Sequence, residues 1–229
     1  MNILLIGCAA FLSTYLGGSF ALKFKDRLHL ILGFSAGAVI AVAFFDLLPE
    51  SIVIGNGYYS VETMTTFVAL GFIAFMLLDR FVLFHRHIHD DHDHENEHEH
   101  SHARGIIGAG SLSLHSFLDG VAIGLAFQVS SAVGFFVTVA VLAHDFSDGI
   151  NTVNMILKNG GTVSDARKWL LVDSITPVLG IFSTLFFTLP EHILAIILAV
   201  FAGFFTYIGA TDLLPESHHS HPTLWTSFS

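Results

Sequence analysis

Seven stretches of mostly apolar residues follow one another along the chain, and they constrain its fold more than any other feature. A helix needs about 20 such residues to cross the hydrocarbon core of a bilayer. The stretches are residues 2–22, 28–48, 63–84, 105–127, 132–157, 168–189 and 192–214. Charged residues make up only 12% of the 229-residue chain, about half of their usual share in soluble domains. We therefore predict an all-α, polytopic transmembrane helix bundle with seven spans, and we exclude a soluble domain, a coiled coil, a disordered chain and a nucleic-acid-binding protein.

Basic residues set the expected orientation, because Lys and Arg concentrate in cytoplasmic loops. All nine fall in or beside three loops on one side of the predicted bundle: Lys23, Lys25, Arg27, Arg80, Arg86, Arg104, Lys158, Arg167 and Lys168. The loops on the other side contain acidic residues but no Lys or Arg. We therefore expect an integral multi-pass membrane protein whose N-terminus faces outward.

A six-residue motif, Asp-Leu-Leu-Pro-Glu-Ser, occurs twice, at residues 46–51 and 212–217. The first copy is expected to end the second span on the outside, and the second copy to end the seventh span on the inside. One motif in two opposite orientations is typical of the inverted repeats that build alternating-access transporters. The alternative is that both copies only terminate helices, since proline removes a backbone donor.

The fourth and fifth predicted spans each contain a His-x-x-x-Asp-Gly motif. His115 and Asp119 are four residues apart, as are His144 and Asp148, so each pair shares one helical face. Two antiparallel helices joined by a short loop near residues 129–131 would bring the two faces together. Imidazole and carboxylate ligands suit Zn, Fe and Mn, and charged residues inside a span are functional candidates. We predict one metal site from these four residues; the alternative is a pair of structural His–Asp hydrogen bonds.

Further polar residues lie near this predicted site. Ser116 and Asp145 are one position further round their helices and are candidates for an adjacent second metal site. Asp173 precedes a mid-span proline, Pro177, and is a candidate metal ligand or proton acceptor. Asp46 and Asp212 are expected at the ends of their spans, either solvating a helix end or serving metal entry and exit.

The loop after the third span is rich in histidine and acidic residues. Its composition predicts a disordered segment that binds metal, with a solvated spacer as the alternative. The histidines are His85, His87, His89, His92, His94, His98, His100 and His102. We accordingly divide the chain into spans 1–3 (1–84), this cytoplasmic loop (85–104), spans 4–5 with the metal site (105–157), spans 6–7 (158–214) and a short tail (215–229).

These motifs together resemble the ZIP (Zrt/Irt-like) family of divalent metal transporters, over nearly the whole chain. The resemblance implies import of zinc, or of iron, manganese or cadmium, toward the cytosol, with the metal as cargo and not as a cofactor. It further implies eight helices arranged 3+2+3, a binuclear metal site between helices 4 and 5, a homodimer, and movement of one helix bundle against the other.

The chain departs from the family pattern at several positions. Ser116 replaces the usual Asn, Asp119 and Asp148 replace Glu, and Thr176 stands where a Glu usually precedes the proline of span 6. The shorter aspartates withdraw each ligand by one methylene, and Thr176 weakens the second metal position. The family's eighth span is not predicted here, and we expect a truncated reading frame.

Two other functions are compatible with the residues alone. One is a seven-span zinc-dependent membrane hydrolase that activates water. The other is a metal sensor that does not transport, in which the histidine-rich loop binds the ion. The inverted repeat favours a transporter, not an enzyme.

Overall fold

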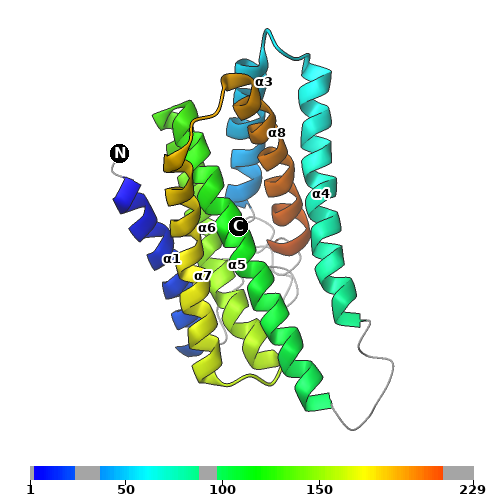
Figure 1. Ribbon diagram of the computed structural model, residues 1–229, viewed down its shortest axis with the longest axis vertical. Coiled ribbons are helices and arrows are strands. Elements are labelled where there is room, and N and C mark those ends of the chain that lie inside the picture. The colour runs from blue at the N-terminus through cyan, green and yellow to red at the C-terminus, as the bar shows by residue number, and fades with distance from the viewer. Residues whose placement is uncertain (1–2, 24–36, 88–96, 214–229) are drawn as a thin grey trace, which may run out of the picture.

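The computed structural model describes residues 3–23, 37–87 and 97–213, and the secondary structure within these ranges is helical (Figure 1). Residues 37–42 are helical and lead directly into the first π-helical turn, η1. A second π-helical turn, η3, follows the last helix, and η2 is a short 3₁₀ turn. In chain order the elements are α1 (Ile3–Lys23), η1 (Ala43–Leu47), α3 (Leu48–Gly55), α4 (Val61–His87), α5 (Glu97–Val129), α6 (Ser131–Lys158), α7 (Val163–Ser183), η2 (Thr184–Phe186), α8 (Glu191–Ile208) and η3 (Gly209–Leu213).

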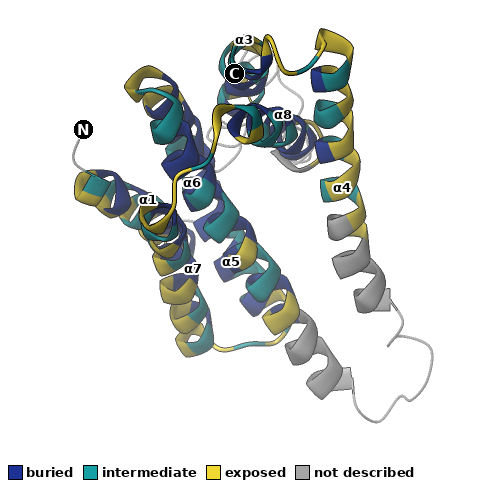
Figure 2. Ribbon diagram, turned by 45° about the horizontal axis from the view of Figure 1, so that its top comes forward, coloured by how far each residue is buried: buried dark blue, intermediate teal, exposed yellow. Residues whose placement is uncertain are grey.

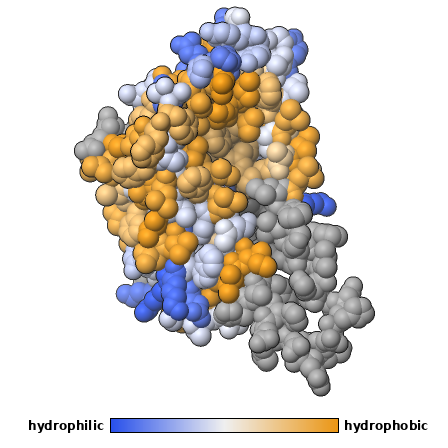
Figure 3. Space-filling model, in the orientation of Figure 1, coloured by the Kyte–Doolittle hydropathy of each residue, from blue (hydrophilic) through white to orange (hydrophobic). Residues whose placement is uncertain are grey.

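The helices have the length and composition of membrane spans. Six helical stretches of 19 to 28 residues are apolar enough to cross a bilayer, and the apolar part of α4, Val61–Leu77, is a shorter seventh. On the face shown in Figure 3, apolar residues form a band across the middle of the molecule, and hydrophilic residues gather at the top and at the lower left. The prediction of a polytopic helix bundle is therefore confirmed, and the protein is an integral multi-pass membrane protein.

The predicted end of the second span is wrong. We expected the span to end at residue 48, but the helical run continues through η1 and α3 to Gly55. Pro49 lies in the first turn of α3 and lacks the N–H that would bond a carbonyl of the preceding turn, and the Leu48 N–H bonds the Ala43 carbonyl across the π turn. The first copy of the repeated motif, with Asp46, is thus inside the helical run.

Two helices begin earlier than predicted. α7 starts at Val163 and not near residue 168, because Thr162 and Asp165 form a capping box that satisfies free backbone N–H groups. α5 starts at Glu97, so the expected disorder over residues 85–104 is wrong where α4 and α5 extend into that segment. Acidic residues such as Glu97 and Glu99 favour a helix N-terminus.

The described helices form two units (Figure 2). The four-helix unit contains α1, α5, α6 and α7, which pack mainly against one another, and the three-helix unit contains α3, α4 and α8. Within the four-helix unit, Gly149 of α6 lies against the backbone of Thr14, and Gly120 of α5 against that of Pro177. Within the three-helix unit, Gly203 of α8 lies against the backbone of Val68. Small residues at these crossings let the helix backbones touch, as is usual in membrane bundles.

The first copy of the repeated motif and the described part of the second, Asp212 and Leu213, belong to helical runs of opposite direction, as predicted. Gly55, at the end of α3, lies beside Ala195 near the start of α8, so the two helices run in opposite directions. Both copies also place their aspartate in a π turn, with Asp46 in η1 and Asp212 in η3. The first two residues of each copy, Asp-Leu, therefore share the same local backbone structure.

Candidate metal centre

Four side chains from α5 and α6 converge where these two helices face each other. α5 ends at Val129 and α6 begins at Ser131, with the Ser130 hydroxyl capping the new helix by accepting the Val133 N–H. This tight turn makes the two helices antiparallel neighbours and brings their His-x-x-x-Asp faces together. We call the four residues the quartet: His115, Asp119, His144 and Asp148.

The quartet has the dimensions of a metal site. One ligand atom from each residue lies within 4.8 Å of all the others, and the four side chains are buried. His115 Nε2 lies 3.2 Å from Asp119 Oδ2 and 3.4 Å from Asp148 Oδ2. His144 Nε2 lies 3.2 Å from Asp119 Oδ2 and 4.0 Å from Asp148 Oδ2. Each imidazole therefore faces the carboxylates of both helices.

Hydrogen bonding prepares one imidazole to bind a cation. His144 Nδ1 lies 3.0 Å from the Ala140 carbonyl, which only accepts hydrogen bonds. In a neutral ring Nδ1 therefore carries the proton, and the Nε2 lone pair faces the carboxylate of Asp119. This arrangement is typical of histidines that ligate metals through Nε2.

The carboxylates of the quartet also need a cation. Asp119 Oδ1 is buried without a hydrogen-bond partner in the described structure, and so is Asp148 Oδ2. A buried carboxylate is costly unless it is paired, hydrogen-bonded or bound to a metal. One divalent cation would balance the charges of Asp119 and Asp148. The residues present therefore suit a divalent metal with nitrogen and oxygen ligands.

The three-helix unit covers the quartet with aromatic rings. The His115 ring lies 5.7 Å from that of Phe75 on α4 and 5.3 Å from that of Phe204 on α8. Phe205 of α8 lies edge-on to His144 at 5.7 Å. Phe75 and Phe204 contact each other at 4.1 Å. The ligand atoms thus belong to one unit, and the other unit supplies an apolar cover.

The predicted residues of a second site are near the quartet but outside it. Asp145 is fully buried, and both its carboxylate oxygens are without a hydrogen-bond partner in the described structure. The Ser116 hydroxyl lies 2.8 Å from Asp173, to which it donates. Thr176 donates its hydroxyl to the Asp173 carbonyl. A second metal position that uses Ser116 and Asp145 stays a prediction.

The other predicted residues lie away from the quartet. Asp46 is half-buried in η1. Asp212 is in η3, and its side chain lies outside the described residues. His85 and His87 are in the last turn of α4, and three more histidines, His98, His100 and His102, are in the first turns of α5. His89, His92 and His94 lie outside the described residues.

Sequence reasoning missed Thr152 and the aromatic cover. Thr152 of α6 donates a 2.7 Å hydrogen bond to Asp173 Oδ2. Its position four residues after Asp148, on the same helical face, was the available signal. Phe75, Phe204 and Phe205 are three of 23 phenylalanines, and nothing in the sequence distinguishes them from phenylalanines that face lipid.

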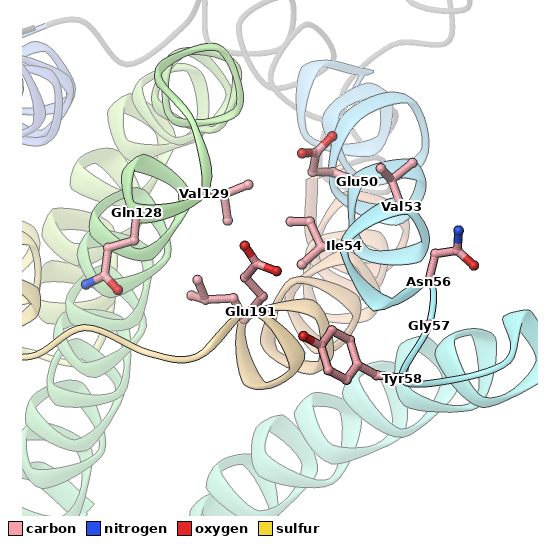
Figure 4. Close-up of a pocket in the computed structure, with 10 residues that line it drawn as sticks. Glu50, Val53, Ile54, Asn56, Gly57, Tyr58, Gln128, Val129 and Glu191 are labelled. Atoms are coloured by element: carbon pink, nitrogen blue, oxygen red, sulfur yellow. The ribbon is translucent and has the colours of Figure 1, made fainter.

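A cavity of about 670 Å³ opens at the end of the molecule where α5 ends and α8 begins (Figure 4). It is lined by residues of both units, including Gln128 and Val129 of α5, Ile54 of α3 and Glu191 of α8. Glu50, from the repeated motif, also lines it. The cavity is at the opposite end of α5 from the histidine-rich segment.

The quartet lies in the part of the chain that matches a known protein family. The sequence model of the ZIP zinc transporter family matches residues 85–229, which include α5 to α8 and the whole quartet. The chain is 32% identical to zinc transporter foi of Drosophila melanogaster over 111 residues. It is 33% identical to human zinc transporter ZIP10 over 107 residues and 32% identical to human zinc transporter ZIP4 over 103 residues.

These alignments cover part of each protein. They include 48%, 46% and 45% of this chain, but only 16%, 13% and 16% of the foi, ZIP10 and ZIP4 proteins, respectively. The family match is broader, because it extends over more than half of the chain and over both helices of the quartet. The family consists of transporters and not enzymes, and this chain belongs to the ZIP zinc transporter family.

Proposed function

We propose that the protein transports a divalent metal ion, zinc foremost, across a membrane, and that the quartet is its principal binding site. The observation that carries this proposal is the convergence of two imidazoles and two carboxylates, all buried, within 4.8 Å. Iron, manganese and cadmium are the other cargo ions in this proposal. The relatives named as zinc transporters support zinc.

The number of ligands favours transport over hydrolysis. A catalytic zinc site usually has three protein ligands and keeps a fourth position open for water. The quartet supplies four protein ligands, His115, Asp119, His144 and Asp148, which leaves a tetrahedral ion without an open position. A cargo ion needs only to be bound and released, so four ligands are compatible with transport.

The direction of transport is proposed from charge. The Lys and Arg residues lie in or beside loops at one end of the helices, which the positive-inside rule assigns to the cytoplasm. The N-terminus then faces outward, and the histidine-rich segment at 85–104 is cytoplasmic and binds arriving metal. The cavity beside Glu50 and Glu191 is then on the outer side, and import toward the cytosol would begin there.

Alternating access is proposed from the two packed units. All four ligands belong to the four-helix unit, whereas the three-helix unit contacts the quartet through Phe75, Phe204 and Phe205. These ring contacts involve no hydrogen bonds, so the units can move past each other without breaking hydrogen bonds to the ligands. Such movement about a mid-membrane site is a common basis of alternating access. A homodimer in the bilayer completes this proposal.

Metal uptake into proteoliposomes tests the proposed function. Vesicles that contain the full chain and a metal-sensitive dye are expected to take up zinc with saturable kinetics, and cadmium, iron or manganese is expected to compete. Zinc binding by the solubilised protein without any uptake would contradict the transporter proposal and would favour the metal-sensor alternative.

A further inference from the structure

Asp173 connects three helices beside the quartet. Its Oδ1 accepts a 2.8 Å hydrogen bond from the Ser116 hydroxyl of α5, and its Oδ2 accepts a 2.7 Å hydrogen bond from the Thr152 hydroxyl of α6. Asp173 itself is on α7, and all three side chains are fully buried. Hydrogen bonds to a carboxylate are among the stronger ones in proteins. We call this group the Asp173 clamp.

The clamp residues on α5 and α6 lie close in the sequence to the metal ligands on the same helices. Ser116 follows His115 in the chain, and Thr152 lies one helical turn after Asp148. The Ser116 hydroxyl also lies 3.1 Å from the Leu112 carbonyl, but it has one proton to donate, and the carboxylate is the closer acceptor. The clamp therefore couples α5 and α6 through α7 close to the point where their metal ligands meet.

The backbone around Asp173 is adapted to this role. Pro177 lacks the N–H that would otherwise bond the Asp173 carbonyl, and the Thr176 hydroxyl donates to that carbonyl at 2.8 Å instead. Gly120 of α5 lies against the Pro177 backbone, and Gly180 of α7 lies against the Phe117 backbone. α5 and α7 are thus in backbone contact within two turns of Asp173.

We propose that Asp173 is a positioning residue that fixes the spacing of α5 and α6 for metal binding, and that it is not itself a ligand. Both its carboxylate oxygens already accept hydrogen bonds from hydroxyl groups, so their hydrogen-bonding capacity is used without a cation. Asp119 of α5 and Asp148 of α6 both approach the two imidazoles, and the clamp holds the two helices at the spacing that these contacts require. This inference rests on the proposed metal-binding role of the quartet.

Thr152→Val tests the clamp, because valine keeps the shape of threonine but removes the donor. Its matched control is Thr138→Val, since Thr138 is also buried on α6 but donates its hydroxyl to Gly134 of its own helix. Ser116→Ala has an equivalent control in Ser113→Ala on α5, where the hydroxyl donates to Ala109. Thr152→Ser keeps the hydroxyl and is the rescue variant.

The readout is the zinc dissociation constant of the detergent-solubilised full chain. Subtracting the binding of the His144→Ala variant removes the contribution of the histidine-rich segment. Thr152→Val and Ser116→Ala are each expected to weaken quartet binding about 10-fold, as is typical when a group supporting a metal ligand is removed. The Thr138→Val, Ser113→Ala and Thr152→Ser variants are expected to bind zinc as the unmodified chain does.

The outcomes separate the clamp from the proposed function. Equal zinc affinity in Thr152→Val and Thr138→Val would overturn the clamp while leaving the quartet intact. Equal binding by the unmodified chain and His144→Ala would overturn the quartet, and with it the role of the clamp. Should Thr152→Val not fold, the comparison of Ser116→Ala with Ser113→Ala decides the question in the same way.

Discussion

His144 Nε2 on α6 lies 3.2 Å from Asp119 Oδ2 on α5, although 25 residues separate the two in the chain. Both side chains are fully buried in a helix pair that spans the membrane. The contact joins the two copies of His-x-x-x-Asp-Gly, because each copy contributes one partner. A cation bound at this point would be held by both helices at once.

Glycine contacts are expected to be essential to the four-helix unit. A Cβ at position 120 would collide with the Pro177 backbone, whereas one at position 110, on the same helix, would lie 3.7 Å from the Trp169 ring. Gly120→Ala should destabilise the protein by about 1–3 kcal/mol and lower its thermal midpoint in detergent, while Gly110→Ala should not. Equal midpoints for the two variants would contradict the described packing of α5 on α7.

The aromatic cover is expected to control the rate of metal exchange. Phe204→Leu removes the ring that lies 5.3 Å from His115 but leaves every ligand atom in place. Release of bound zinc to a chelator, followed by stopped-flow fluorescence, should therefore accelerate, with little change in the dissociation constant.

Phe201→Leu is the control for this variant, because Phe201 lies on the same helix and packs on Phe204 and Phe205, but its ring has no described contact with His115 or His144. It should leave the release rate unchanged. An unchanged release rate in Phe204→Leu would show that the ring does not restrict access to the quartet.

The histidine-rich segment is expected to regulate transport without being required for it. Replacing the eight histidines at 85–102 with serine keeps the chain length, which matters because α4 and α5 extend into this segment. Basal zinc uptake should persist in proteoliposomes, while the dependence of uptake on cytoplasmic zinc should change. Complete loss of uptake would place these histidines on the transport path.

Much of the fold and the quartet could be predicted from the sequence. Apolar stretches identify membrane helices because the bilayer imposes their length, and the predicted span at 132–157 differs from α6 by one residue at each end. The four-residue spacing of His115 and Asp119 fixes their common face on any α-helix. Because the connection at Ser130 is short, α6 must then lie antiparallel beside α5.

The remaining features depend on tertiary contacts that no local pattern encodes. Pro49 is compatible with either a helix end or a first turn, and the π turn at 43–47 decides between them. Asp173 has a side chain that could ligate metal, but its two carboxylate oxygens accept hydrogen bonds from Ser116 and Thr152. Phe204 becomes a cover for the quartet only because α8 packs near α5.

Zinc uptake into proteoliposomes by the full chain and its Asp119→Asn variant tests the central claim most directly. The substitution keeps the size of the side chain but removes the negative charge that faces both histidines. Glu62→Gln, at an exposed carboxylate in the first turn of α4, is the control. We predict saturable uptake by the unmodified chain and by Glu62→Gln, and only background uptake by Asp119→Asn. Undiminished uptake by Asp119→Asn would contradict the assignment of the quartet as the transport site.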